Sequence, residues 1–207
     1  MTDKSCREFL NMLASAEPIP GGGGASAMVG ALGAALGGMV GNLTLGKKKY
    51  ESVQEDIKAL LDRAGKLQSE LLSLVVKDAE VFEPLSRAYG LPKNTDEEKK
   101  HREAVMEEAL RLACSVPVEL MEKSMEAVAL HEEMAVKGTR IAISDAGVGV
   151  LFCKSALLGA SLNVFINTKL MKDRKYAEAI NKKAEMLISQ CIARADRVYR
   201  NVEEQLK

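Results

Sequence analysis

A regular stripe of apolar residues between Val53 and Leu85 most constrains how this chain can fold. Its members alternate steps of four and three residues: Val53, Ile57, Leu60, Ala64, Leu67, Leu71, Leu74, Asp78, Val81 and Leu85. This spacing is typical of one face of an α-helix, and it continues for about nine turns. We therefore predict a long helix that packs lengthwise against other helices.

The other long segments also have helical periodicity, and none alternates as a β-strand does. Helices are expected over residues 4–15, 24–46, from the Thr95 capping box towards Gly138, from Ser144 to about residue 171, and from about Asp173. Pro117 is expected to bend or split the helix that contains it. The prediction is all-α: an elongated bundle of about six helices, with one or two central Gly/Ala-rich apolar helices, in a single domain over residues 1–207.

Composition narrows the functional classes. Lys plus Arg and Asp plus Glu are balanced at 29 each, whereas a nucleic-acid-binding domain normally has a basic excess. The four cysteines lie far apart without a C-x-x-C pair, which is typical of reduced packing residues in a cytosolic protein. The N-terminus has no signal-peptide pattern. We expect a cytoplasmic protein that does not bind nucleic acid.

The segment "PIPGGGGASAMVGALGAALGGMVGNLTLGKKKY", residues 18–50, has three interpretations. Its "GNLTLGKK" resembles a phosphate-binding loop, but Lys48 stands where Ser or Thr is needed and no strand precedes it. The uncharged run is long enough for a membrane span, but it is mostly Gly and Ala and lacks an aromatic belt. Its glycines recur at helical spacing, which lets neighbouring helices approach closely. We favour a central buried helix and no membrane span.

The two ends of this segment leave alternatives open. Gly21, Gly22, Gly23 and Gly24 form a flexible loop and helix cap, or they bring bare backbone N–H groups to an anionic ligand. Lys48, between two other lysines, opposes the helix macrodipole, or it receives an anionic substrate tail.

Asp78 departs from the apolar stripe, because the spacing predicts an apolar residue at its position. A carboxylate there must be paired, neutralised or facing a cavity, unless the helix has already left the core. Burial and neighbouring charges tune its pKa, so it is a candidate acid or base. Asp145 fits ordinary helix capping, and Asn163 and Asn167 lie one turn apart, where they bond each other, the fold or a ligand.

Several motifs together resemble the cyclodeaminase/cyclohydrolase family of folate enzymes over nearly the whole chain. They are "PIPGGGGASAMVGALGAALGGMVGNLT", "GKKKY", "KDAEVF", "GLPKNTDEEK", "SVPVEL", "ISDAGVG" and "GASLNVFINT". The resemblance implies an all-helical homodimer with the folate site in a groove beside the glycine loop. It implies a folate substrate, with or without a polyglutamate tail, and no metal or other cofactor.

The resemblance also implies roles for residues. Asp78 becomes the acid/base or the stabiliser of a cation, and Asp145 lies in or near the site. Asn163 hydrogen-bonds the pterin or formyl group. Lys48, and less strongly Lys93, receive the glutamate tail. Gly21 to Gly23 match the family loop, whereas Gly24 stands where many members have Ser, so the role of Ser26 two residues later is open.

The activity expected first is methenyltetrahydrofolate cyclohydrolase, in which water opens the methenyl ring to formyltetrahydrofolate. The alternative is formiminotetrahydrofolate cyclodeaminase, in which ring closure expels ammonia. An alternative of another class is a non-catalytic helical dimer that binds folate or a protein.

Overall fold

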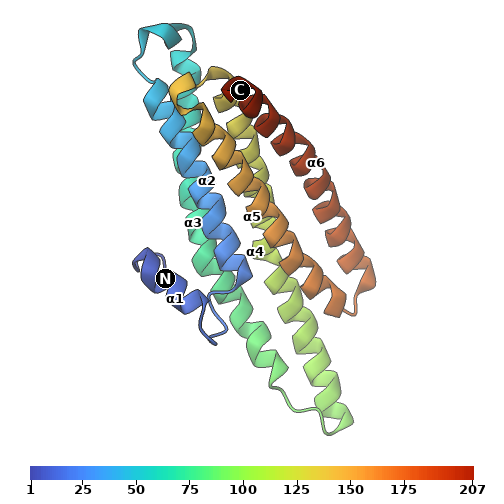
Figure 1. Cartoon of the computed structure of the whole chain (residues 1–207). Helices are drawn as coiled ribbons and strands as arrows, with labels where there is room; N and C mark the ends of the chain where they lie inside the picture. The colour runs from blue at the N-terminus through green and yellow to red at the C-terminus, as the bar shows by residue number, and fades with distance from the viewer.

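The computed structural model describes all 207 residues and contains six α-helices, two short 3₁₀ helices and no strand (Figure 1). The helices are α1 (Cys6–Leu13), α2 (Gly22–Thr44), α3 (Gln54–Tyr89), α4 (Asp96–Lys137), α5 (Ile143–Leu170) and α6 (Arg174–Leu206). The 3₁₀ helices η1 (Lys48–Val53) and η2 (Arg140–Ala142) precede α3 and α5. The predicted all-α bundle of about six helices is confirmed.

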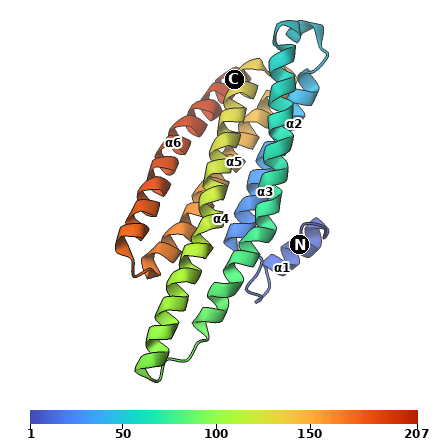
Figure 2. The same ribbon diagram turned by 180° about the vertical axis from the view of Figure 1, so that it is seen from behind.

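Helices α2 to α6 run side by side as an elongated bundle, and α1 lies against one side of it (Figures 1 and 2). The hairpin of α3 and α4 extends beyond the ends of the other helices. Its α4 begins with the predicted capping box, in which Glu98 N–H donates to Thr95 Oγ1 at 3.1 Å and Thr95 N–H donates to the Glu98 carboxylate at 3.1 Å. Pro117 does not split α4, which is continuous from Asp96 to Lys137.

Helix α2 packs against three helices through its glycines. A Cβ atom at Gly33 would lie 2.6 Å from Cys153 Sγ on α5. At Gly37 it would lie 2.8 Å from a methyl carbon of Leu130 on α4, and at Gly41 the same distance from Leu61 on α3. These separations leave no room for a side chain. The glycine spacing along α2 therefore exists because neighbouring helices approach its backbone closely.

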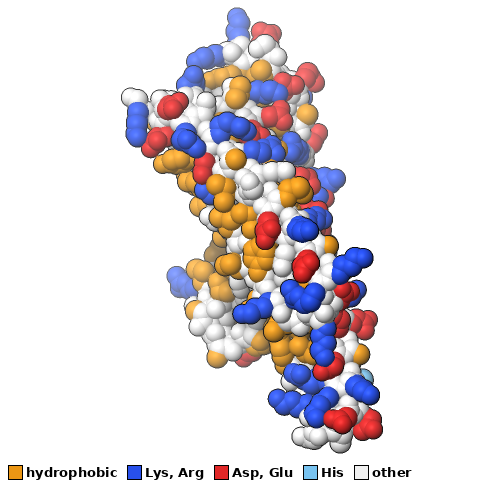
Figure 3. All heavy atoms as spheres, turned by 90° about the vertical axis from the view of Figure 1, so that its right-hand side faces the viewer, with side chains coloured by type: hydrophobic (Ala, Val, Ile, Leu, Met, Phe, Trp, Pro, Cys, Tyr) orange, Lys and Arg blue, Asp and Glu red, His pale blue; other side chains and the backbone are white.

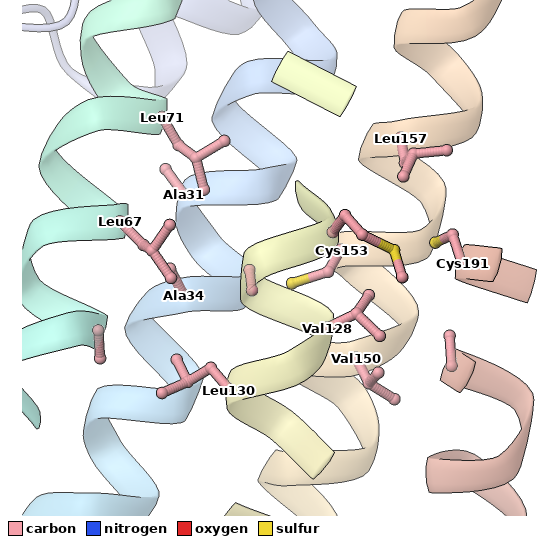
Figure 4. Close-up of a cluster of buried hydrophobic side chains, with 14 of the residues drawn as sticks. Ala31, Ala34, Leu67, Leu71, Val128, Leu130, Val150, Cys153, Leu157 and Cys191 are labelled. Atoms are coloured by element: carbon pink, nitrogen blue, oxygen red, sulfur yellow. The ribbon is translucent and has the colours of Figure 1, made fainter. Parts of the chain in front are cut away.

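The core between these helices is mostly apolar. Figure 4 shows Ala31 and Ala34 of α2, Leu67 and Leu71 of α3, Leu130 of α4, Cys153 and Leu157 of α5, and Cys191 of α6 converging on it. Cys114, Cys153 and Cys191 are buried free thiols, as predicted for packing residues, whereas Cys6 is exposed.

Two helical segments, α2 and the stretch Arg140–Leu170 that contains α5, are long and apolar enough to cross a membrane by length and composition. About half of each segment's most apolar window is buried within the bundle, at 50% and 44% respectively. Each segment therefore has one face inside the bundle and one face outside it. The core helix of a soluble protein meets the same criteria of length and composition.

A histidine in this core makes stability depend on pH. The Nε2 of His131 on α4 lies 2.9 Å from the carbonyl oxygen of Gly33, and its Nδ1 has no partner. Burial lowers the pKa of His131 from 6.5 to about 4. Between these two pKa values the unfolded chain therefore binds a proton that the folded chain excludes. Neutral His131 contributes up to about 3 kcal/mol to the free energy of unfolding above pH 6.5, and this stabilisation is lost as pH falls towards 4.

We expect the free energy of urea unfolding to fall between pH 6.5 and 4.5 in the natural chain. The dependence should be weaker in His131→Gln, whose amide can still donate to the Gly33 carbonyl but cannot titrate. Equal pH slopes for the two proteins in this window would contradict the assignment to His131.

Candidate active site

A cleft opens where the glycine loop meets α3, α4 and α5. Its polar lining comes from the Gly21–Gly23 backbone, Asp78 of α3, and Asn163 and Asn167 of α5. Its apolar lining consists of Pro18, Ile19, Val81, Phe82, Leu85, Tyr89, Ala113, Pro117 and Ile166. The cleft therefore combines an apolar wall with a few polar groups at one end, as is usual for small-molecule sites.

The start of α2 is shaped to hold the Asp78 carboxylate. Gly21 is the N-cap residue, and no side chain caps the first turn. The N–H of Gly24 donates to the Asp78 carboxylate. A Cβ atom at Gly23 would lie 2.3 Å and 2.5 Å from the two carboxylate oxygens of Asp78. Only glycine at position 23 therefore lets the carboxylate reach the free N–H groups of the helix start.

The electrostatic environment of Asp78 suits proton transfer. The side chain is half-buried, and burial raises the pKa of its carboxyl group, while the hydrogen bond from Gly24 partly opposes this shift. A carboxyl group with a raised pKa is a stronger base and is closer to the pH at which a general acid–base residue works best.

The two asparagines are held by different partners. Asn163 Nδ2 donates to the Gly159 carbonyl at 3.1 Å and lies 3.8 Å from where a Cβ of Gly22 would be. Asn167 Nδ2 donates to the Ala113 carbonyl of α4 at 3.2 Å. That carbonyl has no helical partner, because Pro117, four residues later, lacks an N–H. Asn163 and Asn167 therefore both face the cleft and do not bond each other.

A single chain brings together only part of the predicted site. Gly21, Gly22, Gly23, Asp78 and Asn163 line one cleft, and Gly24 lies just behind it as a hydrogen-bond donor. Ser26 is used within the fold, where its hydroxyl donates to the Gly22 carbonyl at 2.7 Å.

The other predicted residues lie elsewhere. Lys48 follows the far end of α2, about 33 Å along that helix from Gly22. Asp145 is in the first turn of α5, about 27 Å from Asn163 along the helix. Lys93 is exposed in the loop between α3 and α4, beyond the cleft residue Tyr89.

Sequence reasoning did not select the apolar wall or the role of Asn167. Phe82, Tyr89 and Ile166 line the cleft but follow ordinary helical positions in the sequence. Pro117 could have indicated the role of Asn167, because a proline inside a long helix leaves one backbone carbonyl without its helical partner, and another group must satisfy that carbonyl.

Comparison with known proteins identifies the family. The family model described as formiminotransferase-cyclodeaminase matches residues 5–186. The methenyltetrahydrofolate cyclohydrolase of Methylorubrum extorquens is 44% identical over 204 residues, which cover 99% of this chain and 98% of that protein. The chain belongs to the formiminotransferase-cyclodeaminase family.

Two other proteins, one known from its sequence and one from its crystal structure, are also similar to this chain over nearly its whole length. The formimidoyltransferase-cyclodeaminase of Mus musculus is 32% identical over 98% of this chain, which corresponds to 38% of the length of the mouse protein. The crystal structure of formiminotetrahydrofolate cyclodeaminase from Thermotoga maritima superposes with a TM-score of 0.88 at 28% identity, covering 99% of this chain and 98% of that one. The resemblance inferred from the motifs is confirmed, and the helical bundle is the fold of this family.

Proposed function

We propose that this protein is a methenyltetrahydrofolate cyclohydrolase, an enzyme that adds water to methenyltetrahydrofolate and opens its ring to formyltetrahydrofolate. The observation that carries the proposal is the placement of Asp78, a half-buried carboxylate with a raised pKa at the polar end of the cleft. The full-length similarity to the cyclohydrolase of Methylorubrum extorquens supports this choice of reaction.

The proposed reaction needs one group that both holds a proton and stabilises positive charge. The methenyl carbon lies between two ring nitrogens and shares their positive charge, which the negative Asp78 carboxylate stabilises on binding. As water attacks this carbon, Asp78 accepts the proton that the water loses, and a C–O bond forms. Asp78 then returns the proton to the nitrogen whose C–N bond breaks. The hydroxyl of the adduct loses its own proton to solvent as the formyl C=O forms on the other nitrogen, so hydration releases one proton overall.

Asn163 and the glycine backbone orient the substrate in this proposal. Asn163 uses its Nδ2 within α5 but has a free Oδ1, which can accept from an N–H group of the pterin. The apolar wall formed by Phe82, Pro117 and Ile166 contacts the flat aromatic parts of the molecule, which leaves the reacting carbon at the polar end of the cleft beside Asp78.

A second candidate reaction is formiminotetrahydrofolate cyclodeamination. It is favoured by the similarity over nearly the full chain to the cyclodeaminase of Thermotoga maritima. It passes through a tetrahedral adduct at the same carbon, so Asp78 serves it equally well. Ammonia release from formiminotetrahydrofolate, measured with a coupled assay, separates the two reactions. Ammonia release without hydration of methenyltetrahydrofolate would replace the first candidate by the second.

We also propose that the enzyme works in the cytoplasm as a homodimer that pairs through α2 and α5. These helices lie at the front of the bundle in Figure 1, and hydrophobic side chains gather along the corresponding left edge of Figure 3. Large apolar side chains on this face, exposed by 39 to 69%, are Leu32, Met39 and Leu43 of α2 and Val148, Leu162 and Ile166 of α5. A continuous apolar face of this kind is typical of an interface.

A two-fold axis across this face would complete the cleft. Gly33 and Cys153 lie at one level of the bundle. Gly22 and Thr44 are each eleven residues from Gly33, and Asn163 and Asp145 are ten and eight residues from Cys153. An axis at this level therefore exchanges the two ends of the face. It brings the helix ends that carry the partner subunit's Asp145 and the partner subunit's Lys48 towards the cleft.

Leu162→Glu is expected to weaken the dimer at least tenfold, because it buries a charge within an apolar interface. Light scattering after gel filtration, over a range of concentrations, measures the effect. Val136→Glu is the matched control, because Val136 is an exposed apolar residue on α4. A wild-type protein that is monomeric at assay concentrations, or that sediments with lipid vesicles through this face, would refute the proposed dimer.

A further inference from the structure

A second hollow lies beyond the cleft, between the outer parts of α3 and α4 and the end of α5. Tyr89 lines both the cleft and this hollow. Four charged residues also line it: Arg102, Glu103, Glu107 and Lys172. The cleft and the hollow are therefore adjacent stretches along the same helical hairpin, the one that extends beyond the other helices in Figure 2.

Three of the four charged groups are already partnered within the chain. Glu103 and Lys172 form an ion pair at 2.5 Å. Glu107 accepts hydrogen bonds from the backbone N–H groups of Lys172 at 2.7 Å and Asp173 at 3.3 Å, and it pairs with Arg111 at 3.5 Å. The acidic groups of the hollow are thus neutralised by the fold itself.

Arg102 is the exception. Its guanidinium has no carboxylate within 4.0 Å, and its Nε is buried without any hydrogen-bond partner. An unpaired buried donor on a cation is costly, and an anion such as a carboxylate satisfies it, because the guanidinium fork binds a carboxylate through two parallel hydrogen bonds. A missing anionic partner for Arg102 is therefore expected to come from outside the chain.

The position of Arg102 fits one end of the proposed substrate. Asp78 and Tyr89 are about 16 Å apart along α3, and Phe82 and Leu85 line the wall between them. A reduced folate is likewise extended, with the reacting carbon near the pterin, an apolar benzoyl ring in the middle, and glutamate carboxylates at the far end.

We propose that Arg102 binds a carboxylate of the substrate's glutamate tail, with Tyr89 packing against the benzoyl ring at the junction of the two hollows. The proposal rests on the proposed function, because it places the reacting carbon at Asp78. It also gives the tail a binding site within one subunit, whereas Lys48 of the same chain lies at the opposite end of the bundle.

The test compares two ligands that differ only in the glutamate. Equilibrium dialysis with Arg102→Gln is expected to weaken the binding of tetrahydrofolate about tenfold or more, the loss of a charge-assisted hydrogen bond. Binding of tetrahydropteroate, which has no glutamate, should not change. In turnover, KM for methenyltetrahydrofolate should rise while kcat stays constant, because the tail contributes equally to the ground state and the transition state.

Arg87→Gln is the matched control, since Arg87 is exposed on α3 and pairs with Glu83 one turn away. Arg102→Lys keeps the charge but loses the fork, and should give an intermediate loss of tetrahydrofolate binding in a folded protein by circular dichroism. An equal loss for both ligands, or no loss for either, would overturn the role of Arg102.

The two proposals fail in different ways. If the wild-type protein turns over neither folate but still prefers tetrahydrofolate through Arg102, the tail site stands and the proposed reaction falls. If it turns over methenyltetrahydrofolate and Arg102→Gln treats both ligands as the wild type does, the reaction stands and the tail site falls.

Discussion

Replacing Asp78 with asparagine is expected to leave the helical bundle intact and to reduce turnover of methenyltetrahydrofolate about 10²-fold or more. Asparagine has nearly the shape of aspartate, and the side chain is only half-buried, so the fold does not depend on its charge. The reaction does, because water must lose a proton and the substrate carries a positive charge. Stopped-flow absorbance, with circular dichroism as the check on folding, measures both effects.

The pH profile gives a second readout for the same residue. Burial raises the pKa of Asp78, and only the ionised carboxylate accepts a proton. The value of kcat/KM should therefore fall as pH decreases through a pKa above the ordinary aspartate value of 3.8. Asp78→Asn should lack this acidic limb. Full activity of the variant, or an unchanged acidic limb, would exclude Asp78 as the base.

Gly23→Ala is expected to reduce turnover nearly as much, although it adds one methyl group far from any bond that breaks. The added Cβ would overlap the Asp78 carboxylate, whose nearest oxygen would lie 2.3 Å away. The carboxylate is the end of a flexible side chain, so it can turn aside while the helix remains folded. It then loses the hydrogen bond from Gly24, and a misplacement of about 1 Å can cost about 10²-fold in rate.

Gly65→Ala is the control for this substitution. Gly65 is exposed in the middle of α3, and a Cβ there would have no neighbour within 4 Å. It should stabilise the protein by about 0.5–1 kcal/mol in urea unfolding, because alanine favours the helix, and leave turnover unchanged. If Gly23→Ala behaves like Gly65→Ala, the contact between Gly23 and Asp78 has no role in turnover.

The helices were predictable because each carries its own signal. The stripe from Val53 to Leu85 corresponds to α3, and the Thr95 capping box marks the start of α4 within a residue. The misfit of Asp78 on that stripe likewise pointed to the cleft. These signals are local in the chain, so a single sequence contains them.

What the sequence did not reveal depends on contacts between distant segments. The proximity of Gly23 to Asp78 arises from the packing of α2 on α3, and no local pattern around either residue indicates that they are in contact. Asn167 faces Ala113 across two helices because Pro117 frees that carbonyl. Arg102 looks like any surface cation in the sequence, and only the packed hairpin shows that its Nε is buried and unpaired.

The central claim is that this cleft hydrates methenyltetrahydrofolate, and its most direct test is the near-ultraviolet absorbance of that substrate. Added wild-type protein should accelerate the decay of the absorbance well above the buffer rate, in proportion to enzyme concentration. Asp78→Asn at the same concentration should be at least about 10²-fold slower. A wild-type decay no faster than the buffer blank would contradict the proposed cyclohydrolase.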